Sequence, residues 1–61
     1  MATYDVPGLG RMTVTIDRHT FGNSDSVLKS LGDVRDESGT QVSFETWEKV
    51  NKHLRSIGAV N

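Results

Sequence analysis

An alternating row of polar side chains near the N-terminus is the first feature that could do chemistry. The stretch RMTVTID, residues 11–17, places Arg11, Thr13 and Thr15 on one side of an extended chain and apolar residues on the other. Guanidinium and hydroxyl groups at this spacing can hydrogen-bond to the edges of DNA bases when a strand lies in the major groove. The same row is also typical of a plain solvent-exposed strand, because threonine favours strands for packing reasons. Both interpretations remain open.

Catalytic and metal-ligating residues are scarce in this chain. It has no cysteine and only two histidines, His19 and His53. A metal site needs several ligands close together, and covalent catalysis needs a nucleophile beside a base. We expect His19 in a loop and His53 on a helix, so neither has an evident serine partner. The sequence therefore predicts no catalytic residue, no metal site, no other cofactor and no enzyme activity.

Size and charge set further limits. The 61 residues predict a single small domain, residues 1–61, and an apolar content of 34% predicts a modest core without disulfides. A second subunit or a bound partner would add burial to such a core. Seven basic and eight acidic residues give a net charge of −1, which counts against DNA binding. The sequence has no apolar stretch long enough to span a membrane and no visible signal peptide, so it predicts a cytoplasmic protein without membrane contact.

The N-terminal third predicts extended structure. Residues 3–6 are followed by Pro7-Gly8-Leu9-Gly10, a strong turn pattern, and then by the strand at residues 11–17. The two extended pieces form either a hairpin or a lone strand with an N-terminal arm. Residues 18–23 are expected to form a loop.

The middle of the chain allows two interpretations. Ser24 and Asp25 suit a helix N-terminus, and four apolar residues follow at helical spacing, which predicts a helix to about residue 37. These residues are Val27, Leu28, Leu31 and Val34. Gly32 lies inside this stretch and weakens a helix. If the helix ends at Gly32, residues 33–36 pair instead with residues 40–44 across a turn at residues 37–39.

The C-terminal third predicts a second helix. Ser43 is a fitting N-cap, Glu45 and Lys49 have the favourable i,i+4 spacing, and Gly58 fits the residue that ends the helix. An apolar stripe runs along it. The stripe consists of Phe44, Trp47, Val50, Leu54 and Ile57.

The predicted fold class is therefore α+β, with a strand or N-terminal hairpin followed by two helices. The alternative is two hairpins and two helices in the order ββαββα. In the first arrangement we expect a core in which residues of the strand pack against both helices. These core residues are Met12, Val14, Ile16, Val27, Leu31, Trp47 and Val50.

The stretch ESGTQVSFETWEKVNKHLRSIG, within residues 11–58, resembles the ribbon-helix-helix family of Arc-repressor type. The resemblance implies a homodimeric transcriptional regulator, a repressor that inserts a β-ribbon into DNA. Arg11, Thr13 and Thr15 would contact bases, and backbone N–H groups around Ser43 would hold a phosphate. The longer loop at residues 18–23, Gly32 and the acidic charge depart from the family pattern. The last helix also resembles the third helix of a Lac-repressor-type headpiece.

A different class of function fits the same sequence. The acidic balance and small size also suit a protein-binding inhibitor or adaptor module that acts by protein–protein contact without binding DNA. In that case the partner would meet the charged segment of residues 33–37, together with exposed charges of the last helix. The DNA-binding regulator is the leading interpretation of the sequence, and this protein-binding module is the alternative.

Overall fold

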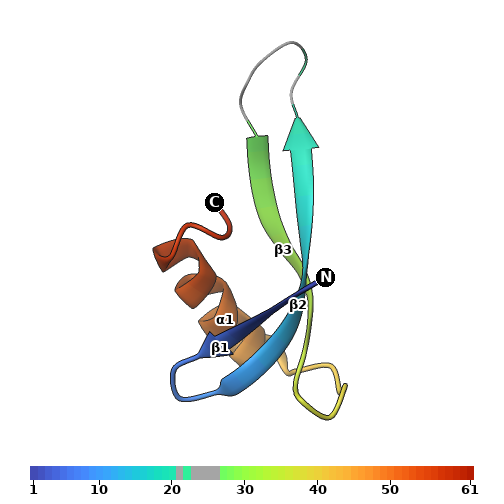
Figure 1. Ribbon diagram of the computed structural model, residues 1–61, viewed down its shortest axis with the longest axis vertical. Coiled ribbons are helices and arrows are strands. Elements are labelled where there is room, and N and C mark those ends of the chain that lie inside the picture. Colours follow the sequence, from blue (N-terminus) through green and yellow to red (C-terminus); the bar gives the residue numbers. More distant parts are fainter. Residues whose placement is uncertain (21, 23–26) are drawn as a thin grey trace.

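Three antiparallel strands and one helix make up the structure (Figure 1). The computed structural model describes residues 1–20, 22 and 27–61. The elements are β1 (Ala2–Val6), β2 (Gly10–Thr20), β3 (Val27–Arg35) and α1 (Phe44–Ser56). The strand order is β1-β2-β3, and β2 and β3 extend beyond the helix as a two-stranded arm.

The N-terminal extended pieces form a hairpin. Tyr4 lies opposite Met12 in the β1–β2 register, and the backbone N–H of Leu9 donates to the carbonyl of Val6 at 2.9 Å. Gly8 and Gly10 take φ values of 81° and 86°, which glycine adopts without a steric penalty. The turn that the sequence predicts at residues 7–10 therefore joins two paired strands.

The helix predicted from residue 24 to about residue 37 is wrong, because Val27–Arg35 forms strand β3. In the register, Val34 lies opposite Val14 and Leu31 lies opposite Ile16. Two residues of β3 thus oppose one residue of β2, which is a β-bulge. The bulge turns Leu31 and Val34 to the same face although they are three positions apart, and this spacing imitates a helix. The predicted caps, Ser24 and Asp25, lie outside the described residues.

Both predicted fold classes need correction. A three-stranded sheet followed by one helix is neither a strand with two helices nor the order ββαββα. The pairing expected between residues 33–36 and 40–44 is reduced to an isolated bridge between Arg35 and Gln41. The loop expected at residues 18–23 is also misplaced, because Arg18, His19 and Thr20 continue β2. Residues 21 and 23 of that loop lie outside the described part of the chain.

The C-terminal helix is confirmed. The Ser43 hydroxyl accepts a 3.3 Å hydrogen bond from the backbone N–H of Thr46, as an N-cap does. Glu45 and Lys49 form an ion pair at 3.8 Å, and Gly58 follows the helix with a φ of 80°. No helix in the described residues is long and apolar enough to cross a lipid bilayer.

The core lies between one face of the sheet and α1. Its buried members are Val6, Met12, Val14, Leu31, Val34, Val50, Leu54 and Val60. Of the expected core residues, Ile16 and Trp47 are half-buried and Val27 is exposed, because it lies in the arm that α1 does not cover. Val50 and Leu54 carry the helix packing, whereas Phe44 and Ile57 of the predicted stripe are exposed at the two ends of the helix.

Candidate functional site

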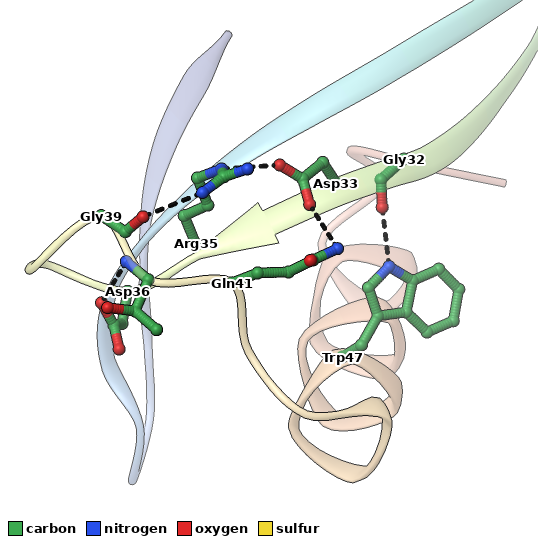
Figure 2. A network of polar contacts seen from close by, with 8 residues as sticks. Gly32, Asp33, Arg35, Asp36, Gly39, Gln41 and Trp47 are labelled. Atoms are coloured by element: carbon green, nitrogen blue, oxygen red, sulfur yellow. Dashed lines mark hydrogen bonds and ion pairs between the residues drawn. The ribbon is translucent and has the colours of Figure 1, made fainter.

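The outer edge of β3 is bonded at three places along its length. The backbone N–H of Lys29 donates to Asn61 Oδ1 at 2.7 Å, and the backbone N–H of Asn61 donates back to the Lys29 carbonyl at 2.8 Å. Trp47 Nε1 donates to the carbonyl of Gly32 at 2.7 Å, as Figure 2 shows. The backbone N–H of Val42 donates to the carbonyl of Val34 at 3.1 Å. This edge therefore offers little free backbone to another strand.

The outer edge of β1 is different. β1 pairs with β2 only, and in the described residues no other element makes a backbone hydrogen bond to its outer side. In an antiparallel pair, alternate residues point their N–H and C=O groups away from the partner strand. The one charged side chain of β1 is Asp5, which pairs with Arg11 at 3.5 Å. The outer edge of β1 is thus open, whereas the outer edge of β3, on the opposite side of the sheet, is partly bonded.

A hollow lies where β1 ends, between the β1–β2 turn and α1. We call it the turn hollow. Its lining is formed by Val6, Pro7, Gly8, Leu9, Lys49, Lys52, His53 and Ser56. The floor is mainly apolar, and its charged groups are the lysines Lys49 and Lys52, beside the imidazole of His53. Lys49 forms an ion pair with Glu45, whereas Lys52 forms no ion pair within the described chain.

A second hollow lies where β1 begins. We call it the start hollow. Its lining is formed by Met1, Ala2, Tyr4, Ile16, Arg18, Lys29 and Ala59. Arg18 and Lys29 are directly opposite one another in the β2–β3 register, where like charges repel. Lys29 Nζ donates to the carbonyl of Gly58 at 3.2 Å, which offsets part of that repulsion. Neither hollow has an aspartate or glutamate in its lining.

The predicted base-contacting residues lie on the opposite face of the sheet. Arg11, Thr13 and Thr15 alternate with the buried Met12 and Val14, so they face away from α1. A shallow depression there is lined by Thr3, Asp5, Arg11, Thr13 and Glu37. The proposed DNA role of these residues stays a prediction.

Acidic groups accompany both arginines near this face. Arg11 pairs with Asp5, and Arg35 Nε donates to Asp33 Oδ2 at 2.8 Å (Figure 2). Glu37 adds a further carboxylate beside Arg11. Because these arginines already lie beside carboxylates, they would contribute less to DNA affinity by neutralising phosphates.

Ser43, the fourth predicted DNA-contacting residue, is not brought together with the other three. It caps α1, which packs on the other face of the sheet. Its hydroxyl is occupied by the N–H of Thr46, and Glu45 adds a negative charge in the first turn. These hydrogen bonds do not test whether the backbone N–H groups around Ser43 hold a phosphate, so that contact also stays a prediction.

An aromatic pair lies at the start of α1. The rings of Phe44 and Trp47 stack with centroids 6.0 Å apart and planes 7° from parallel. Phe44 is 73% exposed, whereas Trp47 is half-buried and anchored to Gly32. A small hollow there is lined by Gln41, Val42, Phe44 and Trp47.

Most charged side chains of residues 33–37 form hydrogen bonds within the chain. Asp36 Oδ1 accepts bonds from the Ser38 hydroxyl at 2.6 Å and from the backbone N–H groups of Ser38 and Thr40 at 3.0 Å. The Ser38 hydroxyl bond, followed by the backbone bonds, lowers the pKa of Asp36 below its ordinary range. Asp33 accepts from Arg35 and, at 3.1 Å, from Gln41 Nε2 (Figure 2). A partner role for this segment remains a prediction.

Comparison with known proteins gives no relative: no protein-family model, no curated protein and no solved structure matches the chain. Within residues 1–20, 22 and 27–61, no group of three or more His, Asp or Glu side chains is placed to hold a metal ion. The open β1 edge with its two basic hollows is the site that sequence reasoning missed. Nothing in the spacing of the α1 lysines Lys49 and Lys52 indicates that the β1–β2 turn lies beside them.

Proposed function

We propose that this chain is a small protein-binding module that takes an extended segment of a partner protein along β1. The observation that carries the proposal is the contrast between the two edges of the sheet. The edge of β3 is bonded by Asn61, Trp47 and Val42, whereas the outer edge of β1 receives no backbone hydrogen bond within the described chain. Proteins commonly block sheet edges, so an edge left open in a sheet whose other edge is partly blocked is a natural place for strand addition.

The energetics suit a short segment. β1 has five residues, so an added strand pairs with a limited number of backbone groups. Each such hydrogen bond contributes a net of roughly 0.5–1.5 kcal/mol, and side-chain pockets must supply the rest of the affinity. The turn hollow and the start hollow lie at the two ends of β1 and are placed to do this.

The test is a selection from a random-peptide display library against the full immobilised chain. Selected peptides are then synthesised and titrated into the isotope-labelled protein, while amide shifts and amide hydrogen exchange are followed by NMR. We expect slowed exchange at alternate amides of β1. Enrichment of no peptide, or peptides that leave β1 exchange unchanged and shift Phe44 or Arg11 instead, would refute the proposal.

A second copy of the chain could occupy the same edge in place of a partner segment. The homodimer expected from the sequence is untested and would be one such case. In an antiparallel β1–β1 pair, the turn hollow of one copy lies beside the start hollow of the other. Lys52 of one copy then approaches Arg18 and Lys29 of the second, which is unfavourable. Light scattering over a dilution series should give the monomer mass. A dimer that protects β1 amides would replace the partner segment by a second copy.

DNA binding is the second candidate function. The observation that favours it is the row of Arg11, Thr13 and Thr15 on one uncovered face of the sheet. A sheet face of this kind can contact bases, but the neighbouring carboxylates of Asp5 and Glu37 reduce attraction to phosphates. We therefore rank it after partner binding.

A further inference from the structure

We infer that the segment received by β1 is acidic, with carboxylate side chains toward the helix side of the sheet and an apolar side chain between them. This inference rests on the proposed function and adds the chemistry of the partner to it. It is carried by the two hollows that flank the open strand.

The charge at both ends of β1 has one sign. Lys49, Lys52 and His53 surround the turn hollow, and Arg18 and Lys29 line the start hollow. No carboxylate lines either hollow. A strand lying along β1 would therefore pass from one basic site to the other, and carboxylates on its helix side would meet cations at both ends.

The spacing of those carboxylates follows from strand geometry. Side chains alternate between faces, so only every second residue of the added strand points toward the helix side. β1 has five residues, which fixes the first and last helix-side positions four residues apart, or roughly 13 Å at about 3.3 Å per residue. The pattern is acidic–x–apolar–x–acidic. The apolar position lies opposite Tyr4, at the margin of the start hollow, where the half-buried Tyr4 and Ala59 offer apolar surface.

The other face of the added strand has the opposite requirement. Its side chains lie beside Thr3 and Asp5, on the side of the sheet that also carries Glu37. Acidic residues at these positions would face Asp5 and are disfavoured, whereas threonine or another neutral residue is accepted. A uniformly acidic run therefore fits less well than an alternating one.

A second copy of this chain does not have the required pattern. The helix-side residues of β1 are Ala2, Tyr4 and Val6, and its one acid, Asp5, points to the other face. The charge pattern thus favours a foreign segment over self-pairing.

The experiment uses three blocked synthetic peptides, TETVTET, TQTVTQT and TKTVTKT, titrated into the full isotope-labelled chain by NMR. We expect the glutamate peptide to slow exchange of β1 amides and to bind about tenfold more tightly than the glutamine peptide, with the lysine peptide weakest. Added salt should reduce the difference. Equal binding of all three at β1 would overturn the acidic preference and leave strand addition standing. If none of the three peptides alters amide exchange in β1, the inferred acidic segment is wrong, whatever peptides the library selection returns.

Charge-reversal variants on one helix provide the matched control. Lys52→Glu removes a cation from the turn hollow, whereas Arg55→Glu makes the same change three residues later, outside both hollows. We expect Lys52→Glu to weaken the glutamate peptide about tenfold and to strengthen the lysine peptide, and Arg55→Glu to change either by less than about twofold. Equal effects of the two variants would show that only the net charge matters, which would overturn the assigned site. Circular dichroism checks that both variants stay folded.

Discussion

The indole of Trp47 donates a 2.7 Å hydrogen bond from Nε1 to the carbonyl of Gly32, and so fixes the start of α1 to the bulge of β3. The two residues are fifteen positions apart, and the bond spans the layer between helix and sheet. The Trp47 side chain thus supplies a hydrogen-bond partner to a backbone carbonyl within the bulge, where the β2–β3 ladder is interrupted.

Trp47→Phe should therefore lower the free energy of unfolding. The variant keeps an aromatic ring but leaves the part-buried Gly32 carbonyl without its donor, which costs about 1 kcal/mol. Urea unfolding followed by circular dichroism measures the change. Phe44→Ala is the control at the same end of the helix, and because Phe44 is 73% exposed it should cost less. Equal losses would show that ring stacking, and not the hydrogen bond, matters.

Gly32→Ala should destabilise the protein for a steric reason. A Cβ at Gly32 would lie 3.1 Å from the backbone oxygen of Thr15 and 3.2 Å from Asp17 Oδ2. A backbone oxygen moves less easily than a side chain, so we expect a loss of about 1 kcal/mol in thermal unfolding. Asp17→Ala removes only the side-chain contact. Gly32→Ala should therefore remain destabilising in an Asp17→Ala background, and full recovery there would contradict the backbone clash.

Leu54→Ala should be among the most damaging single changes. Leu54 is fully buried between α1 and the sheet, and truncating a buried leucine costs about 2–5 kcal/mol through lost burial and the cavity left behind. A domain of this size has little more stability than that, so the variant should be largely unfolded by circular dichroism at room temperature. Ile57→Ala, at the exposed end of the same predicted stripe, should leave the spectrum unchanged.

Asp36 should make the turn at residues 36–40 sensitive to acid. Its pKa is lowered in the folded chain, so its carboxylate stabilises the fold above its unfolded value of 3.8. That contribution is lost as the pH falls through the lower folded pKa. We expect the difference in melting temperature between the native protein and Asp36→Asn to be largest near neutral pH and to shrink in strong acid. A difference that is constant over this range would rule out the carboxylate as its cause.

Asp5→Asn separates the two candidate functions. The change frees Arg11 from its 3.5 Å ion pair and removes one negative charge from the uncovered sheet face. If that face contacts DNA, affinity for a labelled duplex at low salt should rise by a few-fold, and Arg11→Ala with Thr13→Ala should lower it. Fluorescence anisotropy measures both. Partner binding at β1 predicts no duplex binding by any of these variants.

The sequence predicts the parts of this fold that depend on local chemistry. The cap at Ser43, the Glu45–Lys49 pair and the terminating Gly58 act within one or two helical turns, and all three are present. The turn at residues 7–10 is likewise local. β3 could not be identified in this way, because the bulge lets Leu31 and Val34 share a face at helical spacing.

The candidate site depends on contacts between residues far apart in sequence. The β3 edge is blocked by Asn61 bonding Lys29 across 32 positions, and the turn hollow brings Leu9 beside Lys52. Neither contact produces a periodic pattern in the sequence. The basic residues of the two hollows can be read from the sequence. That β1 is an open edge follows only from the position of β3, which the sequence predicts as a helix.

The unequal edges of the sheet also limit stoichiometry. A module with two open edges can pass its pairing on from copy to copy and grow into a filament. Here β3 is bonded at Lys29, Gly32 and Val34, so this part of the β3 edge gives a further copy few backbone groups with which to continue the pairing. If β1 receives a partner segment as proposed, we expect complexes with one partner per copy and no filaments.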